Sequence, residues 1–439
     1  MLAKAVRSEK RLLRWGEGPL NSSPAVAFPA ALAMWLSCTF SPAVGCLTRP
    51  PPFFLDSRST HWFLPAPIHA ERRQMRRVSF QFLLPCAVVA CLWVMAGPAG
   101  AVTIDMVTVG NPGNANDTGG TGNGAVNYSY QIGKFDVTIG QYTAFLNAAD
   151  PTGTNLNGIY NSSMGTDSNV AGISYNAAAS NGSKYSVIGP SGTAYGQTGA
   201  NRPITYVSWF DAARFANWMA NGQGSGSTEN GAYDLTTAPE GTAPAKNLIN
   251  PNTGAAPTFY VPTENEWYKA AYYSPTLNSG AGGYYAYATQ SNTKPGNQIG
   301  STANQANYYP EEVYSLTQTD SYDSNQNYLT DVGAFSGSGS FYGTFDQSGN
   351  VYQWNDLDGT AFTSRGLRGG SWGVDSPFLL SSSGSILSAP SDEYFRIGFR
   401  LASPVSVSGV PEIDPSGLSA VLGLIVGGLG LLERRRYGR

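Results

Sequence analysis

The chain contains 439 residues, carries a formal net charge of −3 and is 13% charged; this length allows more than one domain. Its four cysteines and two histidines all precede residue 102, and residues 102–401 hold 11 Lys and Arg against 22 Asp and Glu, a net charge of −11. This acidic part is unsuited to nucleic acid, whose binding rests on neutralised phosphates, and it lacks the usual thiol nucleophile and imidazole base. The composition favours a binding or structural protein; the alternative is an enzyme that uses only carboxylates or tyrosines.

Residues 75–101 have the layout of a secretory signal peptide. A Met-Arg-Arg start is followed by an apolar stretch at 78–95 and by Ala-Gly-Ala directly before Val102, which predicts cleavage at that point. Residues 1–74 are basic, contain a proline-rich stretch and show no periodic pattern. They indicate a misassigned start or a disordered N-terminal extension, and the alternative is a genuine extension with a role of its own.

Three capping-box patterns predict short helices in the region that follows. They are Thr138 with Gln141, Ser208 with Asp211, and Thr263 with Glu266, each followed by apolar residues on one helical face. Strand character is present at residues 259–261 and 396–400. Glycine-, asparagine- and serine-rich stretches at 111–127, 152–201 and 222–258 predict long loops. The pattern is typical of an α+β fold that is rich in loops.

Residues 404–439 carry a second export signal. A Pro-Glu-Ile motif at 411–413 precedes an apolar run at 417–432 and a Glu-Arg-Arg-Arg cluster. The run is close to the lower limit of about 17 residues for a membrane-spanning helix, and the arginines favour the cytoplasmic side. The trio resembles a PEP-CTERM sorting signal, although that motif usually reads Pro-Glu-Pro. The resemblance implies a bacterial protein that is exported and then cleaved or anchored by an exosortase-like enzyme. A plain C-terminal membrane anchor is the alternative.

Six stretches between the two signals carry a family resemblance. In chain order they are Ile-Gly-Lys-Phe-Asp-Val-Thr at 132–138, Arg-Pro-Ile-Thr-Tyr-Val-Ser-Trp at 202–209, Val-Pro-Thr-Glu-Asn-Glu-Trp at 261–267, Ser-Gly-Asn-Val-Tyr-Gln-Trp at 348–354, Arg-Gly-Gly-Ser-Trp at 368–372 and Ile-Gly-Phe-Arg at 397–400. Together they resemble the formylglycine-generating enzyme family, also called the sulfatase-modifying factor domain. The resemblance implies a loop-rich, C-type-lectin-like α+β domain over residues 102–403.

The sequence departs from that family where its chemistry takes place. Active members carry a copper-binding cysteine pair after the Arg-Gly-Gly-Ser stretch, whereas Val374 and Leu379 stand at the matching positions here. Without thiolates there is no soft ligand for copper(I), so formylglycine generation by the known route is not expected. Iron-dependent relatives, which join sulfur to histidine derivatives, need histidine ligands that residues 102–439 do not contain.

The resemblance also implies a calcium site. The matching ligands are the side chain of Asp346, the carbonyls of Gly349 and Val351, and Gln353 in place of the family's glutamate. A hard cation prefers six to eight oxygen ligands of this kind, although the glutamine removes one negative charge. The alternative is that these polar side chains satisfy backbone groups in a buried turn.

A second calcium site is implied at Asn307 and the carbonyl of Tyr308. Its carboxylate ligand would be Asp320 or Asp323, and the sequence does not choose between them. The same alternative of local hydrogen bonding to the backbone applies here, because Asn and Asp commonly have that role in turns.

Other polar candidates have simpler interpretations. Glu264 and Glu266 could be an acid/base pair, but two residues apart at a helix start they are better explained by capping and by the helix dipole. Arg368 and Arg400 each adjoin a glycine and are expected to anchor buried hydrogen bonds to carbonyls or carboxylates.

Aromatic residues suggest a binding surface. The tryptophans inside the six stretches are expected in the core, whereas loop tyrosines are candidates for a surface that binds sugars or proteins: Tyr284, Tyr285, Tyr287, Tyr308 and Tyr309. Because PEP-CTERM-like signals tend to accompany exopolysaccharide, the expected partner is extracellular polysaccharide or an envelope protein. A purely structural surface component is a third possibility.

Overall fold

The computed structural model describes residues 101–189 and 198–405 of the protein. The extension at 1–74, nearly all of the predicted signal peptide and the predicted sorting signal from residue 406 onward lie outside these residues. Within the two described ranges, no helix is both long enough and apolar enough to cross a membrane.

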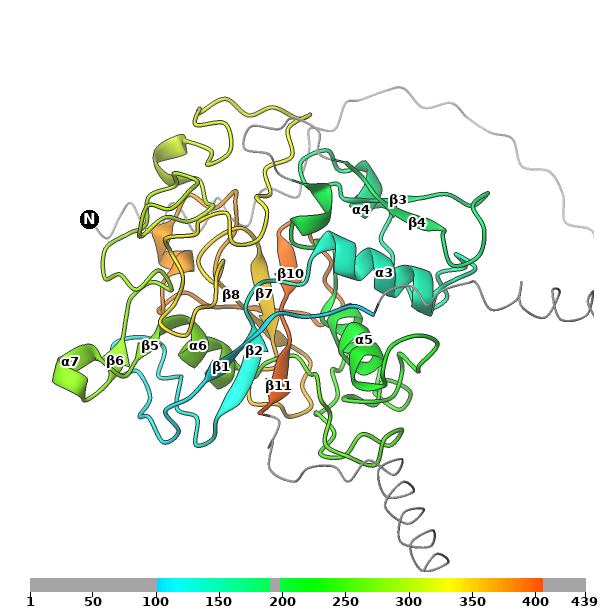
Figure 1. Ribbon diagram of the computed structural model, residues 1–439, viewed down its shortest axis with the longest axis horizontal. Coiled ribbons are helices and arrows are strands. Elements are labelled where there is room, and N and C mark those ends of the chain that lie inside the picture. The colour runs from blue at the N-terminus through cyan, green and yellow to red at the C-terminus, as the bar shows by residue number, and fades with distance from the viewer. Residues whose placement is uncertain (1–100, 190–197, 406–439) are drawn as a thin grey trace, which may run out of the picture. The chain divides into compact units, whose positions relative to one another are not determined.

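Two sheets form the centre of the domain (Figure 1). The larger has the order β10-β7-β8-β9, with β7 (Tyr352–Asn355), β8 (Arg365–Arg368), β9 (Ile386–Ser388) and β10 (Ile397–Phe399). In it β10 runs parallel to β7, and the other neighbours are antiparallel. The smaller is antiparallel in the order β1-β2-β11, with β1 (Met106–Val109), β2 (Tyr130–Gly133) and β11 (Ala402–Pro404). The chain passes from β10 to β11 through Arg400 and Leu401 alone, so these two residues join the sheets.

The three predicted helices are confirmed with their caps. They are α3 (Ile139–Ala149), α5 (Trp209–Ala220) and α6 (Glu264–Tyr272), and each begins with a complete capping box. In the box of α5, the short side chain of Asp211 accepts hydrogen bonds from Ser208 N at 2.9 Å and Ser208 Oγ at 2.6 Å. Local sequence therefore determined where these helices begin.

The helices cover different sides of the larger sheet (Figure 1). On one side α3 and α5 pack through aromatic rings. The ring centroid of Phe215 lies 5.3 Å from that of Phe145 and 5.5 Å from that of Phe399 in β10. On the other side α6 reaches β7 through Trp267, whose Nε1 donates to Gln353 Oε1 at 2.7 Å. The tryptophans expected in the core are all buried: Trp209, Trp218, Trp267, Trp354 and Trp372.

The remaining elements are short and lie in the connections. They are α4 (Ser163–Thr166), β3 (Ile173–Tyr175), β4 (Tyr185–Val187), η1 (Gly199–Asn201), β5 (Tyr273–Ser274), α7 (Leu277–Gly280), β6 (Gly283–Tyr284), η2 (Pro310–Glu312) and η3 (Pro377–Leu380). The stretch at 152–201 is therefore less loop-like than its composition predicts, because β3 and β4 form a hairpin whose tyrosines pack on one another. The strand predicted at 259–261 is reduced to a single bridge between Tyr260 and Ala402.

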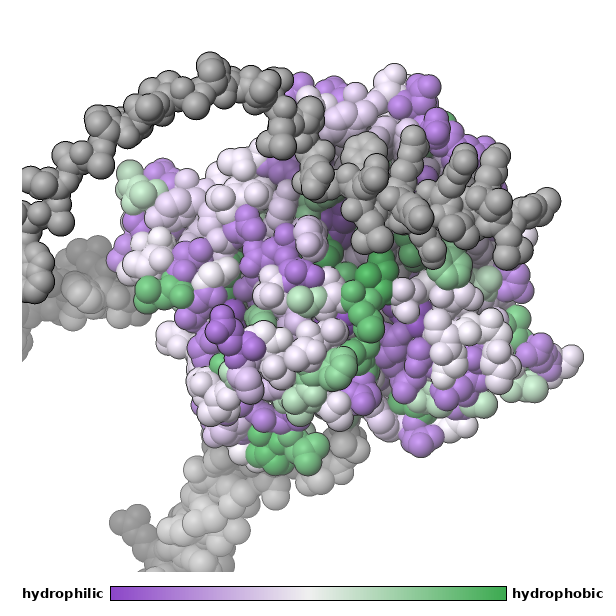
Figure 2. Space-filling model, turned by 180° about the vertical axis from the view of Figure 1, so that it is seen from behind, coloured by the Kyte–Doolittle hydropathy of each residue, from purple (hydrophilic) through white to green (hydrophobic). Residues whose placement is uncertain are grey.

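One face of the domain is mainly polar. The face shown in Figure 2 is mostly pale or purple, and its strongly hydrophobic residues form one narrow band and a few separate groups. Recognition on this face would therefore depend mainly on hydroxyl, amide and aromatic side chains, consistent with a sequence that contains 25 tyrosines.

The buried cap of α5 predicts a dependence of stability on pH. Burial, together with the charge of Glu393, raises the pKa of Asp211 from 3.8 to about 7, although Ser208 and Arg214 act in the opposite direction. Because the folded state then binds this proton more tightly than the unfolded state, its contribution to stability is full below pH 4 and is lost as pH rises toward 7. We expect the free energy of unfolding, measured by urea titration, to fall over this range.

In Asp211→Asn the fall should be smaller, because the amide keeps an acceptor for Ser208 and does not titrate. The exposed substitution Glu240→Gln is the control and should leave the pH dependence as it is in the wild type. An Asp211→Asn variant with the wild-type pH dependence would contradict the assignment.

Candidate functional site

Arg400 joins four separate segments at the junction of the two sheets. Its guanidinium is fully buried, and its Nε donates to Gln353 Oε1 on β7 at 2.7 Å. The two terminal nitrogens donate to the carbonyls of Gly133 at 2.9 Å and Phe345 at 2.8 Å. The same group forms an ion pair with the buried carboxylate of Asp136 at 3.1 Å. The expected anchoring role of Arg400 is therefore confirmed.

Gln353 uses its whole carboxamide in internal hydrogen bonds. Its Oε1 accepts from both Arg400 Nε and Trp267 Nε1 at 2.7 Å, and its Nε2 donates to the carbonyl of Asp346 at 2.8 Å. A calcium ion at Oε1 would lie beside the positive guanidinium and would displace two donors. Gln353 therefore does not fit the role of a calcium ligand.

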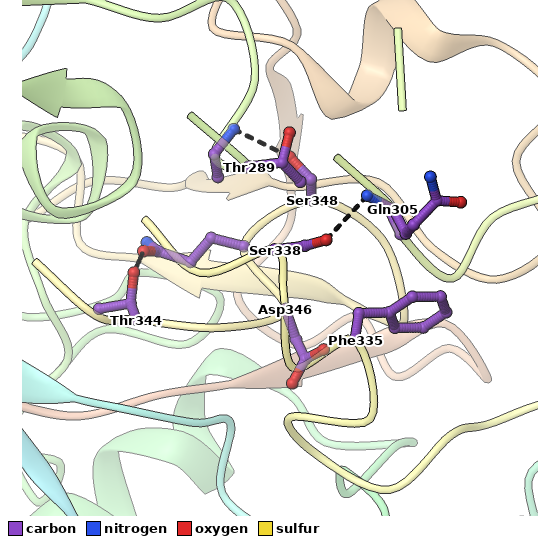
Figure 3. A pocket seen from close by; sticks show the side chains of 10 residues that line it. Thr289, Gln305, Phe335, Ser338, Thr344, Asp346 and Ser348 are labelled. Carbon is purple, nitrogen blue, oxygen red and sulfur yellow. Dashed lines mark hydrogen bonds between the residues drawn. The ribbon is translucent and has the colours of Figure 1, made fainter. Parts of the chain in front are cut away.

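Asp346 faces a small polar cavity of about 10 Å³ (Figure 3), which is room for about one water molecule. Its Oδ2 accepts a hydrogen bond from Gly333 N at 2.7 Å. Burial raises the pKa of Asp346 from 3.8 to about 6, against the opposing effects of Gly333 and Arg400. Ser338, Thr344 and other residues line the rest of the cavity. No cluster of three or more His, Cys, Asp or Glu suited to a metal is found in the described ranges.

The two predicted calcium regions are brought together in space. Asn307 forms a parallel β-bridge with Gly349, and its side-chain amide donates to Tyr328 O and to Asn350 Oδ1, both at 3.0 Å. The carbonyl of Tyr308 accepts from Ser315 Oγ at 3.0 Å. These bonds satisfy backbone and amide groups in a buried turn, which is the alternative that the sequence left open.

Sequence reasoning missed Asn350 and Thr330 in this turn. Asn350 Oδ1 accepts from Thr330 N at 3.2 Å, and its Nδ2 donates to Thr330 O at 3.1 Å. Gly349 and Asn350 both have positive φ, 92° and 65°. The Gly-Asn pair in the sequence could have indicated this turn, because glycine and asparagine tolerate positive φ best. Asp320 and Asp323, the carboxylates considered for the second site, are both exposed.

The segment at the family's cysteine positions is packed as structure. Val374 is buried; its N–H donates to Ser371 O at 3.0 Å and its carbonyl accepts from Tyr309 N at 2.9 Å. Leu379 packs partly buried against the main core. Apolar side chains therefore occupy both positions at which the family resemblance places thiols.

Beside this segment four aromatic rings form a continuous series, which we call the aromatic stack: Trp372, Tyr328, Tyr314 and Tyr309. Successive ring centroids lie 4.9, 4.4 and 4.1 Å apart. Trp372 and Tyr328 are buried at its base, whereas Tyr314 and Tyr309 are partly exposed. Of the predicted tyrosine surface, only Tyr309 belongs to this stack.

Of the other four tyrosines predicted to line a binding surface, one is not at the surface at all. Tyr308 is fully buried, because its hydroxyl donates to the carbonyl of Pro295 in the interior. The other three, Tyr284, Tyr285 and Tyr287, are half-buried.

The acidic pair at the start of α6 has structural roles. Glu266 is buried and accepts from Thr263 N at 2.8 Å and from the hydroxyl of Tyr260 at 2.7 Å. Glu264 forms an ion pair with Arg368, whose Nη1 also donates to Gly384 O at 2.8 Å. The arrangement supports capping and loop anchoring rather than acid/base catalysis.

The Arg400 junction predicts a large stability effect. We expect Arg400→Met to lower the free energy of unfolding by about 3–5 kcal/mol, because the buried carboxylate of Asp136 would lose its charge partner. Urea unfolding of the full-length chain would measure it. Adding Asp136→Asn to this variant should recover part of the loss.

The control for that experiment is Lys294→Met, which removes the exposed ion pair with Glu311 and should leave stability unchanged. Equal effects of Arg400→Met and Lys294→Met would show that the junction does not hold the sheets together.

The internal bonding of Gln353 predicts the response to calcium. We expect the unfolding temperature of the full-length chain to be the same in calcium and in a chelator, since the carboxamide of Gln353 is already fully hydrogen-bonded. Differential scanning calorimetry would measure it. A calcium-dependent rise would show that Gln353 leaves Arg400 to bind the ion, and the rise should then disappear in Asp346→Ala.

Comparison with protein families matches residues 99–405 to the sulfatase-modifying factor enzyme 1-like domain. Comparison with curated protein sequences found no match. Among solved structures, Treponema denticola variable protein 1 is similar, with 18% identity, a TM-score of 0.39, and coverage of 70% of this chain and 96% of that one. CarF shows 20% identity, a TM-score of 0.36 and coverage of 70% and 100%. PvdO from Pseudomonas aeruginosa shows 19% identity, a TM-score of 0.35 and coverage of 68% and 94%.

With TM-scores below 0.5, these structural likenesses add no argument about this chain. The family match is different in kind, because it spans more than half of the sequence and includes all six of the stretches described above. The predicted fold class, a loop-rich α+β domain of the formylglycine-generating enzyme type, is confirmed. The chain belongs to the family of sulfatase-modifying factor enzyme 1-like domains.

Proposed function

We propose that this protein is an exported cell-surface protein whose sulfatase-modifying-factor-like domain binds extracellular polysaccharide and carries out no thiol chemistry. The observation that carries the proposal is the aromatic stack beside the Val374 segment. At the two positions where the resemblance places the family's cysteines, this chain has apolar residues. Beside them lies the aromatic stack, whose rings run from buried to partly exposed.

The absence of thiol chemistry follows from the sequence. Residues 102–439 contain neither cysteine nor histidine, so a copper(I) site or a thiolate nucleophile has no ligand to use. Three of the acidic groups in the interior are also committed to structural contacts. Asp136 pairs with Arg400, Asp356 pairs with Arg365 at 2.8 Å, and Glu266 caps α6.

Aromatic side chains suit sugars because they offer a large, rigid and amphipathic contact surface at low cost in conformational entropy. An envelope protein could use the same rings, and it is the other outcome of the test. The exposed carboxylates of Glu312, Asp320 and Asp375 near Tyr309 favour the sugar, whose hydroxyl groups need hydrogen-bond partners.

The export part of the proposal rests on the two terminal signals. The layout of residues 75–101 favours secretion, and the apolar run at 417–432 with its arginine cluster favours membrane anchoring or processing by an exosortase-like enzyme. If this is correct, N-terminal sequencing of the exported protein should begin at Val102, and a start at Met1 or Met75 would contradict it.

A glycan array with the full-length chain in mild detergent tests the binding function. We expect binding to one or more polysaccharide classes. We also expect no conversion of a cysteine-containing sulfatase peptide in the presence of copper and oxygen, measured by mass spectrometry of the peptide.

Absence of glycan binding, together with capture of a defined envelope protein, would replace the polysaccharide by a protein partner. Conversion of the peptide would overturn the non-catalytic assignment.

A further inference from the structure

The outer end of the aromatic stack is held in place by its main chain. Tyr314 N donates to Thr319 O at 2.9 Å, and its carbonyl accepts from Gln318 N at 2.8 Å. Between Tyr309 and Tyr314 the chain turns through Glu311 and Glu312, which have φ values of 52° and 63°. Non-glycine residues in this conformation are strained, and such strain often occurs at ligand-binding sites. The rings are thus preorganised, so that binding would cost little ordering entropy.

Tyr322 extends the stack to the surface. Its ring is nearly parallel to that of Tyr328, with an interplanar angle of 14° and centroids 6.0 Å apart, and the residue is 58% exposed. The buried ring of Tyr328 therefore contacts the partly exposed ring of Tyr314 and the largely exposed ring of Tyr322, and Tyr309 continues the series beyond Tyr314. The exposed tyrosine rings thus form a rigid aromatic surface that packs against the buried ring of Tyr328.

Arg396 supplies an unused hydrogen-bonding group next to these rings. Its guanidinium lies 5.4 Å from the ring centroid of Trp372 and 4.6 Å from that of Phe395. Its Nε is buried and has no hydrogen-bond partner, and none of the ion pairs of the described residues includes this arginine. This contrasts with Arg365, Arg368 and Arg400, whose guanidiniums are all paired with carboxylates.

The position of Arg396 depends on a glycine. A Cβ at Gly373 would lie 2.8 Å from Arg396 Nη2, so only glycine allows the guanidinium to lie this close to the backbone there. Gly373 directly precedes Val374, the first of the two positions matched to the family's cysteines. The segment that lacks the thiols thus makes room for an arginine with hydrogen bonds to offer.

The charges around the stack are mainly negative. Tyr309 lies within the electrostatic influence of Glu312, Asp320 and Asp375, and all three carboxylates are exposed. An anionic polymer would be repelled by them and by the net charge of −11 over residues 102–401. A neutral sugar meets no such repulsion, because its hydroxyls can donate to carboxylates and accept from a guanidinium.

We propose that Tyr309, Tyr314, Tyr322 and Arg396 form the binding site for a neutral pyranose polysaccharide. Sugar rings stack on the exposed tyrosines, and the terminal nitrogens of Arg396, rather than its buried Nε, donate to ring hydroxyl or ether oxygens. The inference rests on the proposed polysaccharide-binding function and adds the site and the class of glycan to it.

Isothermal titration calorimetry of the full-length chain in detergent tests the site and the glycan class. The neutral probes are cellohexaose and isomaltohexaose, and the anionic probe is hexagalacturonate. We expect binding of at least one neutral probe and none of hexagalacturonate. Tyr309→Ala, Tyr322→Ala and Arg396→Gln should each weaken neutral binding roughly tenfold, as expected for residues at the centre of a binding site.

Tyr175→Ala is the matched control, because it removes a partly exposed tyrosine from a different aromatic group on the β3–β4 hairpin. It should bind as the wild type does. Tyr322→Ala removes a largely exposed side chain and keeps the test valid if Tyr309→Ala lowers the unfolding temperature.

The outcomes separate the two proposals. Neutral binding that is equal in all four variants would place the site elsewhere and overturn this inference, while the polysaccharide function stands. Tighter binding of hexagalacturonate than of the neutral probes would overturn the glycan class. No binding of these probes, and of any glycan on the array, would overturn the polysaccharide function and this inference with it.

Discussion

The fold depends on a buried guanidinium at the junction of its two sheets. Arg400 contacts Asp136, Gly133, Phe345 and Gln353 at once, and these residues come from segments up to 267 positions away in sequence. Desolvating a charge is costly unless its hydrogen bonds are made, so these segments have to be in place together. One side chain thereby couples β2, the approach to α3, and β7.

The same kind of buried arginine holds the long connections after residue 102, where the sequence has no cysteine to form disulfides. Arg365 donates to the carbonyls of Pro244 and Thr360, both at 3.0 Å, and Arg368 donates to Gly384 O. Buried polar networks of this kind are rigid when every member is satisfied. A surface composed mainly of loops can then keep a fixed shape, which a preorganised binding site requires.

The function proposed for this family member is separate from the family's chemistry. Its fold, its capping boxes and its Arg-Gly-Gly-Ser stretch are retained, whereas the segment after that stretch has valine and leucine where the resemblance places cysteines. Valine and leucine at those positions offer no soft ligand for copper(I), whereas the scaffold that presents the neighbouring surface is kept. Arg396 and the aromatic stack lie on that scaffold, so the proposed binding would need nothing more than the scaffold.

The sequence by itself determined what depends on local spacing or composition: the three capped helices, the acidic charge of residues 102–401, the absence of thiols after residue 101 and the order of the family's stretches. Tertiary structure alone decided which distant residues meet. In the folded chain Asn307 forms a β-bridge with Gly349, and Tyr308 is buried. Gln353 accepts a hydrogen bond from Arg400, and the ring of Tyr328 stacks on that of Trp372. The physical reason is that a capping box spans four consecutive residues of one segment, whereas these contacts join loops that no periodic pattern relates.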